Sequence, residues 1–297
     1  MHREKTWLAR GAAPACMLAL LASLAPGARA HDFSGARAME YARKVVSFGP
    51  RPPGSAALRS LRTYILAQLK LDGCEVSEDS FTAQTPVGPV PMVNIIARFP
   101  GKSGRAVVFT GHYDTKKMAG VTFVGADDGG SSTAFLLEMA ETLHGMAHPD
   151  DIYLVWFDGE EAFGEWTETD SVYGSRHLAE KWAADNTLSK IKAFFLVDMI
   201  GDKDLDILPE ENSSPELRQL VWSTAQRLGY GKYFLDSGGP VDDDHMPFVK
   251  MGVKALDLID FDKTYWHTPN DTIDKLSAHS FAVVGTVLMA TLADLER

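Results

Sequence analysis

Apolar runs alternate along this chain with segments in which apolar residues recur at helical spacing. The apolar runs, rich in Val, Ile, Leu and Phe, predict strands at residues 74–81, 92–99, 106–110, 152–157, 193–197 and 254–259. The helical spacing predicts helices at residues 35–48, 56–72, 131–144, 174–184, 215–228 and 274–295. We therefore expect an α/β fold: a single globular domain with a central mixed, mostly parallel β-sheet that helices flank on both faces.

Acidic and histidine side chains follow several of the predicted strands, at or beyond the point where each strand ends. They are His112, Glu160, Glu161, Asp198 and His267. Ligands of such sheets bind beyond the carboxyl ends of the strands, so we expect these side chains to lie close together. The adjacent pair Glu160–Glu161 is especially informative, because a buried unpaired carboxylate is costly and usually marks a metal or an active site.

The residue types at these positions suit zinc. A catalytic zinc takes three His or carboxylate ligands and keeps one position open, and Asp128, Glu161 and His267 would make such a set. Glu160 would then carry protons beside the metal. Gly129 follows Asp128 and would let the backbone approach closely.

Each of these features also has a structural explanation that the residues alone leave open. Residues 127–130 could be a plain turn and helix cap, the Glu pair a solvated loop, and His267 a packed core histidine. The run 242–244 could be a solvated surface, and Trp166, Trp266 and Phe261 could be core residues.

The composition is that of an ordinary globular protein. The chain has 297 residues, 45% of them hydrophobic and 23% charged, with a net charge of -11, which argues against a nucleic-acid partner. Residues 1–30 resemble a Sec-type signal peptide cut after Ala30, which predicts an exported, periplasmic or secreted domain at 31–297 without a stable membrane anchor. Cys74 is then the one remaining cysteine, read as a packed residue rather than a catalytic thiol.

Several strings of residues resemble the glutaminyl-peptide cyclotransferases (glutaminyl cyclases) of animal type. The strings are Gly-His-Tyr-Asp-Thr-Lys at 111–116, Phe-Val-Gly-Ala-Asp-Asp at 123–128, residues 157–163 with Trp166, residues 170–179, Asp-Asp-His-Met-Pro-Phe at 243–248 and Trp-His-Thr at 266–268. They fall in the family's order and cover nearly all of the domain. The chain lacks the cysteine pair of the animal secreted forms and is shorter between residues 188 and 198. Its compactness, the lack of a disulfide and the predicted signal peptide together indicate a bacterial, exported member.

The resemblance implies a zinc aminopeptidase-like fold and a role for each site residue. One zinc would be held by Asp128, Glu161 and His267. Glu160 would act as general base and acid, within a hydrogen-bond network that includes Asp198 and Asp243. The pocket for the glutamine side chain would be lined by Trp166, Trp266 and Phe261, with Tyr265 as an alternative to Phe261. The implied reaction converts N-terminal glutamine of peptides or proteins to pyroglutamate and releases ammonia, and a monomer is the default expectation.

Two other functions stay open at this point. A di-zinc aminopeptidase shares the fold, and all five of its ligand positions are present: His112, Asp128, Glu161, Asp198 and His267. There Glu160 would activate a metal-bridging water. A non-catalytic peptide-binding ectodomain would be expected to have lost ligands. The position of Trp166 after the Glu pair, the string at 243–248 and Trp266 beside His267 favour the cyclase.

Overall fold

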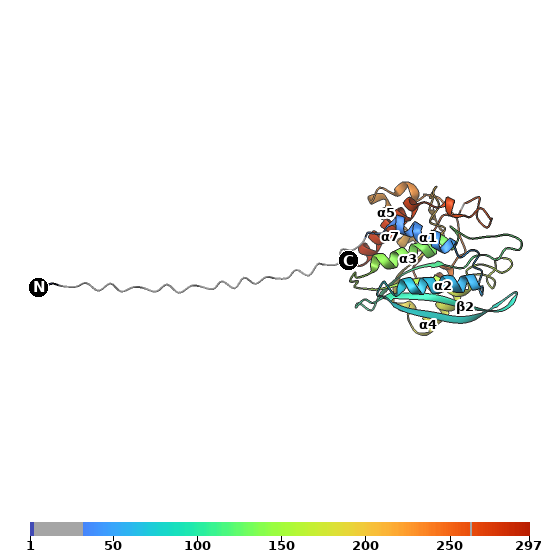
Figure 1. The fold of residues 1–297 in the computed structure, drawn as a ribbon, viewed down its shortest axis with the longest axis horizontal. Coiled ribbons are helices and arrows are strands. Elements are labelled where there is room, and N and C mark those ends of the chain that lie inside the picture. Colours follow the sequence, from blue (N-terminus) through green and yellow to red (C-terminus); the bar gives the residue numbers. More distant parts are fainter. Residues whose placement is uncertain (3–31, 262) are drawn as a thin grey trace.

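A mixed β-sheet runs through the middle of the computed structural model, which describes residues 1–2, 32–261 and 263–297 (Figure 1). Within these residues seven strands pair in the order β1-β2-β4-β3-β5-β7-β6. Their bounds are β1 Glu75–Thr85, β2 Gly88–Phe99, β3 Ala106–His112, β4 Asp151–Phe157, β5 Ile191–Asp198, β6 Leu208–Pro209 and β7 Ala255–Ile259. The predicted signal peptide at 1–30 lies outside the described residues, apart from residues 1 and 2.

Parallel pairing is confined to the centre of the sheet. Strands β4, β3, β5 and β7 are parallel neighbours, whereas β1 with β2, β2 with β4 and β6 with β7 pair antiparallel. The central strands β3 and β5 are buried on both faces, as parallel strands usually are, while β1 exposes most of its residues. The expected mixed sheet is confirmed, with its parallel character limited to these central strands.

Helices cover both faces of the sheet, and Figure 1 shows α1, α3, α5 and α7 gathered on one side and α4 on the other. The bounds are α1 Gly35–Val46, α2 Ala56–Leu69, α3 Gly130–Leu143, α4 Tyr173–Ala184, α5 Pro215–Arg227, α6 Met246–Lys250 and α7 Ala278–Leu295. The helix α2 shares the larger core with α1 and α3, and α6 shares the smaller core with α4.

The two cores follow from the alternation of side chains along the strands. In β3, Val107 and Phe109 point into the larger core, while Val108 points into the smaller one. In β5, Phe195 points into the larger core and Phe194 into the smaller one. Because both faces are covered, the sheet presents its carboxyl-end edge as the place where polar side chains can gather.

Several predicted boundaries were wrong. The last helix begins at Ala278 rather than 274, because Ser277 caps it and residues 273–275 form a separate 3-10 turn. The first two strands are longer than predicted, because their outer residues are polar and pair in a hairpin. The short elements β6 and α6 were not predicted; two and five residues carry too little periodicity.

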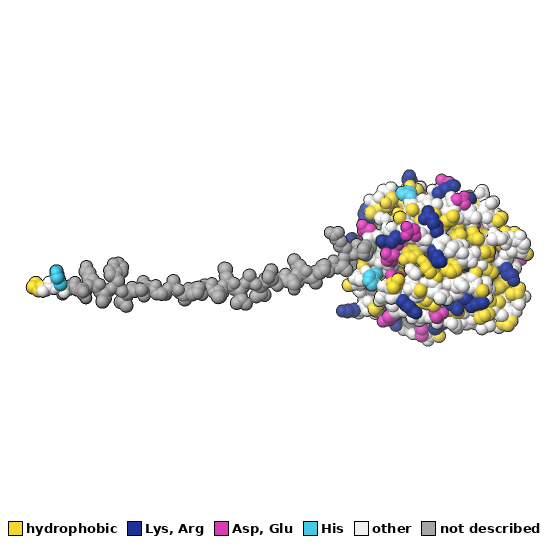
Figure 2. Space-filling view, in the orientation of Figure 1, with side chains coloured by type: hydrophobic (Ala, Val, Ile, Leu, Met, Phe, Trp, Pro, Cys, Tyr) yellow, Lys and Arg dark blue, Asp and Glu magenta, His cyan; other side chains and the backbone are white. Residues whose placement is uncertain are grey.

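Helix α7 is long and apolar enough to cross a membrane by length and composition alone. Its residues Val283, Val287 and Leu288 lie in the larger core, where α7 packs against α1 and α5. On the face drawn in Figure 2, basic and acidic side chains are interspersed, so that face carries no single-sign patch. Cys74 is half-buried, and burial raises the pKa of its thiol to about 11, which agrees with a packed residue.

Candidate active site

The sheet brings all five predicted metal-type side chains to one place. His112 ends β3 and Asp198 ends β5, while Glu161 lies in the loop after β4. Asp128 directly precedes the Gly129–Gly130 start of α3, and His267 lies in the loop beyond β7. The structure therefore confirms that these strand-end residues converge, and it buries every one of them except the half-buried His267.

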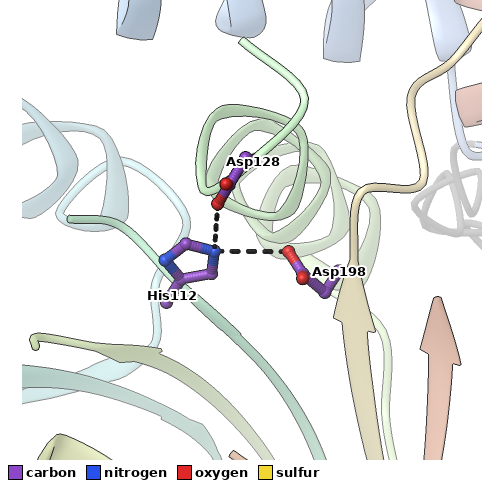
Figure 3. A group of neighbouring side chains, drawn as sticks. All are labelled: His112, Asp128 and Asp198. Carbon is purple, nitrogen blue, oxygen red and sulfur yellow. Dashed lines mark hydrogen bonds and ion pairs between the residues drawn. The ribbon is translucent and has the colours of Figure 1, made fainter. Parts of the chain in front are cut away.

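Asp128 belongs to two overlapping groups of possible metal ligands. In one group, His267 Nε2 lies 3.3 Å from Asp128 Oδ2 and 3.1 Å from Glu161 Oε1. In the other, His112 Nε2 lies 3.2 Å from Asp128 Oδ1 and 3.2 Å from Asp198 Oδ1 (Figure 3). The two oxygens of one carboxylate thus face two histidines, which is the arrangement of a bridging ligand between two neighbouring sites.

The residues fit zinc. Ligand atoms placed about 2.05 Å from a tetrahedral ion lie roughly 3.3 Å from one another, which matches the distances in both groups. Asp128 Oδ2 is buried and has no hydrogen-bond partner among the described residues, as expected of an oxygen reserved for a cation. The set of His nitrogen and carboxylate oxygen is the one zinc takes in catalytic sites. The group Asp128, Glu161 and His267 opens on a pocket, as a catalytic metal requires.

A second layer of polar contacts holds these side chains in place. Asp114 accepts hydrogen bonds from the backbone N–H groups of Glu160 (3.1 Å) and Glu161 (3.3 Å). Asp271 accepts from the N–H group of Asp128 (3.1 Å) and of the residue before it (2.8 Å). Such partners orient metal ligands. The sequence analysis missed Asp271, because its contact with the backbone at Asp128 joins segments that lie 143 positions apart.

The pocket has a volume of about 500 Å³ and is bordered by aromatic side chains. Trp166, Trp266 and Phe261 all line it and are each more than a third exposed, so they are pocket residues rather than core residues. Trp266 stacks on the His267 ring at a centroid distance of 4.0 Å and also lies 4.8 Å from the ring of Phe261. The site thus joins a polar metal face to an apolar, aromatic wall.

Tyr265, the alternative to Phe261, points elsewhere. Its hydroxyl lies 2.8 Å from Asp127 Oδ2 and also contacts Asp202, so the ring is buried beneath the site. Phe261 therefore occupies the pocket position. His267 has φ near +51°, a conformation that non-glycine residues adopt mainly where the surroundings force it, which is common at functional sites.

Glu160 has the properties of a proton carrier. Burial raises the pKa of its carboxyl well above the ordinary value; His112 lowers it, while Glu161 and Asp243 raise it further. Asp243, which also lines the pocket, has a raised pKa because of burial and the neighbouring carboxyl of Asp198. The alternative interpretation of residues 242–244 as a solvated surface run is therefore wrong for Asp243 and Asp244, which are buried. A raised pKa suits a carboxyl that takes and returns a proton near neutral pH.

Gly129 gives the first testable prediction: Gly129→Ala should lower the free energy of unfolding by about 2–4 kcal/mol, from backbone strain and overpacking together. The residue has φ of 76°, and an added Cβ would lie 2.5 Å from Asp114 O and 2.9 Å from His112 Cε1. Urea denaturation of both proteins measures the change.

The matched control is Gly229→Ala, because Gly229 has φ of 80° but no atom within 4 Å of an added Cβ. It isolates the backbone strain, which we expect to cost about 1 kcal/mol. An equal loss of unfolding free energy in the two variants would contradict the close packing around Gly129, next to Asp128.

Comparison with known proteins agrees with this geometry. Peptidase family M28 matches residues 94–292, more than half of the chain. A glutaminyl-peptide cyclotransferase of Drosophila melanogaster is 32% identical over 265 residues, which cover 79% of this chain and 75% of the fly protein.

Two solved structures place the chain among close structural neighbours. The glutaminyl cyclase of an Acidobacteriales bacterium is 41% identical, with a TM-score of 0.86, and the match covers 90% of this chain and 96% of that one. A Zn-dependent exopeptidase from Parabacteroides distasonis is 26% identical, with a TM-score of 0.81, and covers 89% and 99%. The chain therefore belongs to peptidase family M28 and, within it, to the glutaminyl-peptide cyclotransferases.

Proposed function

We propose that this protein converts the N-terminal glutamine of peptides to pyroglutamate with one bound zinc. The observation that carries the proposal is the meeting, in one pocket, of the triad Asp128, Glu161 and His267 with the raised-pKa carboxyl of Glu160 and an aromatic wall. Such a pocket can hold a short uncharged side chain against a metal while a carboxyl moves protons beside it.

The reaction closes a ring within one residue. The α-amine attacks the carbon of the side-chain γ-carboxamide, a five-membered lactam forms, and the amide nitrogen leaves as ammonia. Both reacting groups belong to the same residue, so part of the entropic barrier is already absent. When bound by Asp128, Glu161 and His267, zinc supplies Lewis-acid polarisation of the γ-carbonyl.

The chain's own residues do the positioning and the proton transfer. Glu160 takes a proton from the attacking amine and returns it to the leaving nitrogen. Asp243 contributes to the raised pKa of Glu160, which keeps that proton exchangeable near neutral pH. Trp166 and Trp266 enclose the side chain of the substrate and keep water away from the reacting amide.

A peptide pair tests the proposal. Purified zinc-loaded protein should release ammonia from a Gln-initiated peptide and none from the matching Asn-initiated peptide, because asparagine would have to close a strained four-membered ring. N-acetylation of the Gln peptide should also abolish release, since the amine is the nucleophile. Release from the acetylated peptide at the rate of the free one would mean simple amide hydrolysis and would refute the proposal.

The second candidate function is a di-zinc aminopeptidase. It is favoured by the intact second group of His112, Asp128 and Asp198 and by the similarity to an exopeptidase structure. In that reading Glu160 would activate a water for attack on the first peptide bond. Zinc content discriminates, because the cyclase account expects one equivalent per chain and the peptidase account expects two.

Trp166 provides a further prediction, that Trp166→Ala lowers kcat/KM by about 10- to 100-fold. The substrate would lose an apolar contact worth about 1.5–3 kcal/mol of binding free energy, which corresponds to this fold-change. The indole N–H of Trp166 also donates to Asp242 Oδ2 at 3.2 Å, which joins two loops at the mouth of the pocket. Steady-state kinetics on a Gln-initiated peptide provide the measurement, with Trp166→Phe as the control that keeps most of the ring. An alanine variant with unchanged kcat/KM would remove Trp166 from the substrate pocket.

A further inference from the structure

The segment 241–245 contains Asp243, which lines the pocket, and the buried carboxylate of Glu210 contacts this segment. Glu210 directly follows the edge strand β6 and is fully buried. Its Oε1 accepts a hydrogen bond of 3.0 Å from the backbone N–H of Val241, at the start of the segment. Its Oε2 lies 3.2 Å from Nε2 of the buried His245, at the end of the segment. The two oxygens of Glu210 therefore contact both ends of the segment that presents Asp243.

The Glu210 carboxylate is itself fixed to the sheet. Oε1 accepts a second hydrogen bond, of 2.8 Å, from the N–H of Asn212, and Oε2 accepts one of 2.7 Å from the hydroxyl of Ser213. The Ser213 hydroxyl in turn accepts a hydrogen bond from the backbone N–H of Asp257, which lies in strand β7. Pairing of β6 with β7 places Glu210 at this position.

The turn around Glu210 makes further contacts with the start of this segment and with Gly239, which precedes it. The backbone N–H of Glu211 donates to the carbonyl of Gly239 (3.2 Å), and the side-chain amide of Asn212 donates to the carbonyl of Val241 (3.3 Å). Burial alone would raise the pKa of Glu210, but the contact with His245 and the donors Val241 and Asn212 lower it to about 2. Glu210 is therefore a carboxylate at neutral pH and stays paired on both of its oxygens.

We propose that Glu210 is a positioning residue for the cyclisation: it fixes segment 241–245 at both ends and so holds Asp243 in the pocket that Glu160 also lines. The inference rests on the proposed function, because it assigns Glu210 an effect only through Asp243. Glu210 touches neither substrate nor metal ligands, and its influence is one of geometry. A displacement of about 1 Å at a reacting group can cost roughly a hundredfold in rate, so a support of this kind has a measurable effect.

The variant Glu210→Gln keeps the size of the side chain and its Oε1 acceptor but replaces the oxygen that faces His245. We expect kcat on a Gln-initiated peptide to fall by about 10- to 100-fold. KM should stay within about twofold and the zinc content should be unchanged, because in the part of the chain that the structure describes Glu210 makes no hydrogen bond or ion pair with the aromatic side chains of the pocket or with the metal ligands. A purely structural role would lower the melting temperature without this separation of kcat from KM.

The matched control is Glu138→Gln. Glu138 is also fully buried and paired, with Arg37 Nη2 at 2.9 Å, but it lies on α3 away from the pocket lining. It should lose stability to a similar extent and keep its kcat. Ser213→Ala is the second test variant; it removes one donor to Glu210, and we expect a loss of about two- to fivefold in kcat, so the test does not depend on the folding of one protein.

A double-mutant cycle of Glu210 and Asp243 shows whether Glu210 acts on kcat through Asp243. If Glu210 acts through Asp243, then Glu210→Gln should change kcat by less than about threefold in an Asp243→Asn background. The inference is overturned if Glu210→Gln has the kcat of the parent protein, or if its full loss persists in that background. Failure of the proposed function is a separate outcome, because the parent protein itself would then not cyclise the Gln-initiated peptide.

Discussion

Glu160→Gln should lower the turnover of a Gln-initiated peptide by about 10²–10⁴-fold, the range expected when a general acid–base is removed. The amide keeps the shape of the side chain but cannot take a proton from the attacking amine. Glu160 is not one of the residues that would hold the metal, so zinc content should stay the same as in the parent protein.

The raised pKa of Glu160 is the physical reason for this prediction. Burial raises the pKa of Glu160, and the nearby carboxyls of Glu161 and Asp243 raise it further. An ordinary glutamate would be too weak a base for efficient exchange, whereas a raised pKa brings base strength and proton return into balance. Glutamine is uncharged and keeps the shape of the buried side chain, so stability should not fall with the rate.

The control for this prediction is Glu165→Gln. Glu165 lines the same pocket but is exposed, so its substitution changes the charge of the rim without touching the proton path. We expect less than about a threefold change in kcat. A Glu160→Gln variant that retains zinc and near-normal turnover would contradict the assigned role of Glu160.

The second large effect concerns the metal. His267→Ala should lose bound zinc and reduce cyclisation by about 10³-fold or more, because Lewis-acid catalysis supplies several kcal/mol and each 1.36 kcal/mol is tenfold in rate. His267 Nε2 contacts both Asp128 and Glu161, so its removal leaves these two buried carboxylates without the imidazole that they share. A chelator should abolish the activity of the parent protein, and added zinc should restore it.

His112→Ala is the informative comparison for the same experiment. His112 contacts Asp128 and Asp198 but does not belong to the group that opens on the pocket. In the one-zinc account, metal content stays at one equivalent in the parent protein and in this variant. Metal analysis that finds two equivalents in the parent and one in His112→Ala would contradict that account and support the peptidase reading.

The strand ends could be predicted from the sequence because each strand is marked by a run of neighbouring apolar residues. Each apolar run marks a buried strand, and parallel strands bring their carboxyl ends to one edge, so His112, Glu161 and Asp198 were expected to meet there. The preference of zinc for His nitrogen and carboxylate oxygen then indicated which of these side chains could be metal ligands. The roles taken from the family resemblance stay predictions until the variants are measured.

The supporting residues could not be predicted, because they depend on contacts between distant segments. Asp271 holds the backbone at Asp128 from 143 positions away, and Glu210 reaches Val241 across 31 positions. The direction of Tyr265, inward to Asp127, follows from a hydroxyl that needs buried partners and not from spacing. The short strand β6 exists only through its pairing with β7.

The mass of the product distinguishes cyclisation from hydrolysis of the peptide bond. Zinc-loaded protein is incubated with a Gln-initiated dipeptide, and the products are read by mass spectrometry beside the Glu160→Gln variant. We expect a single product that is lighter than the substrate by one ammonia, with the peptide bond intact, and far less of this product from the variant. Free glutamine together with the shortened peptide would contradict the account and establish hydrolysis in its place.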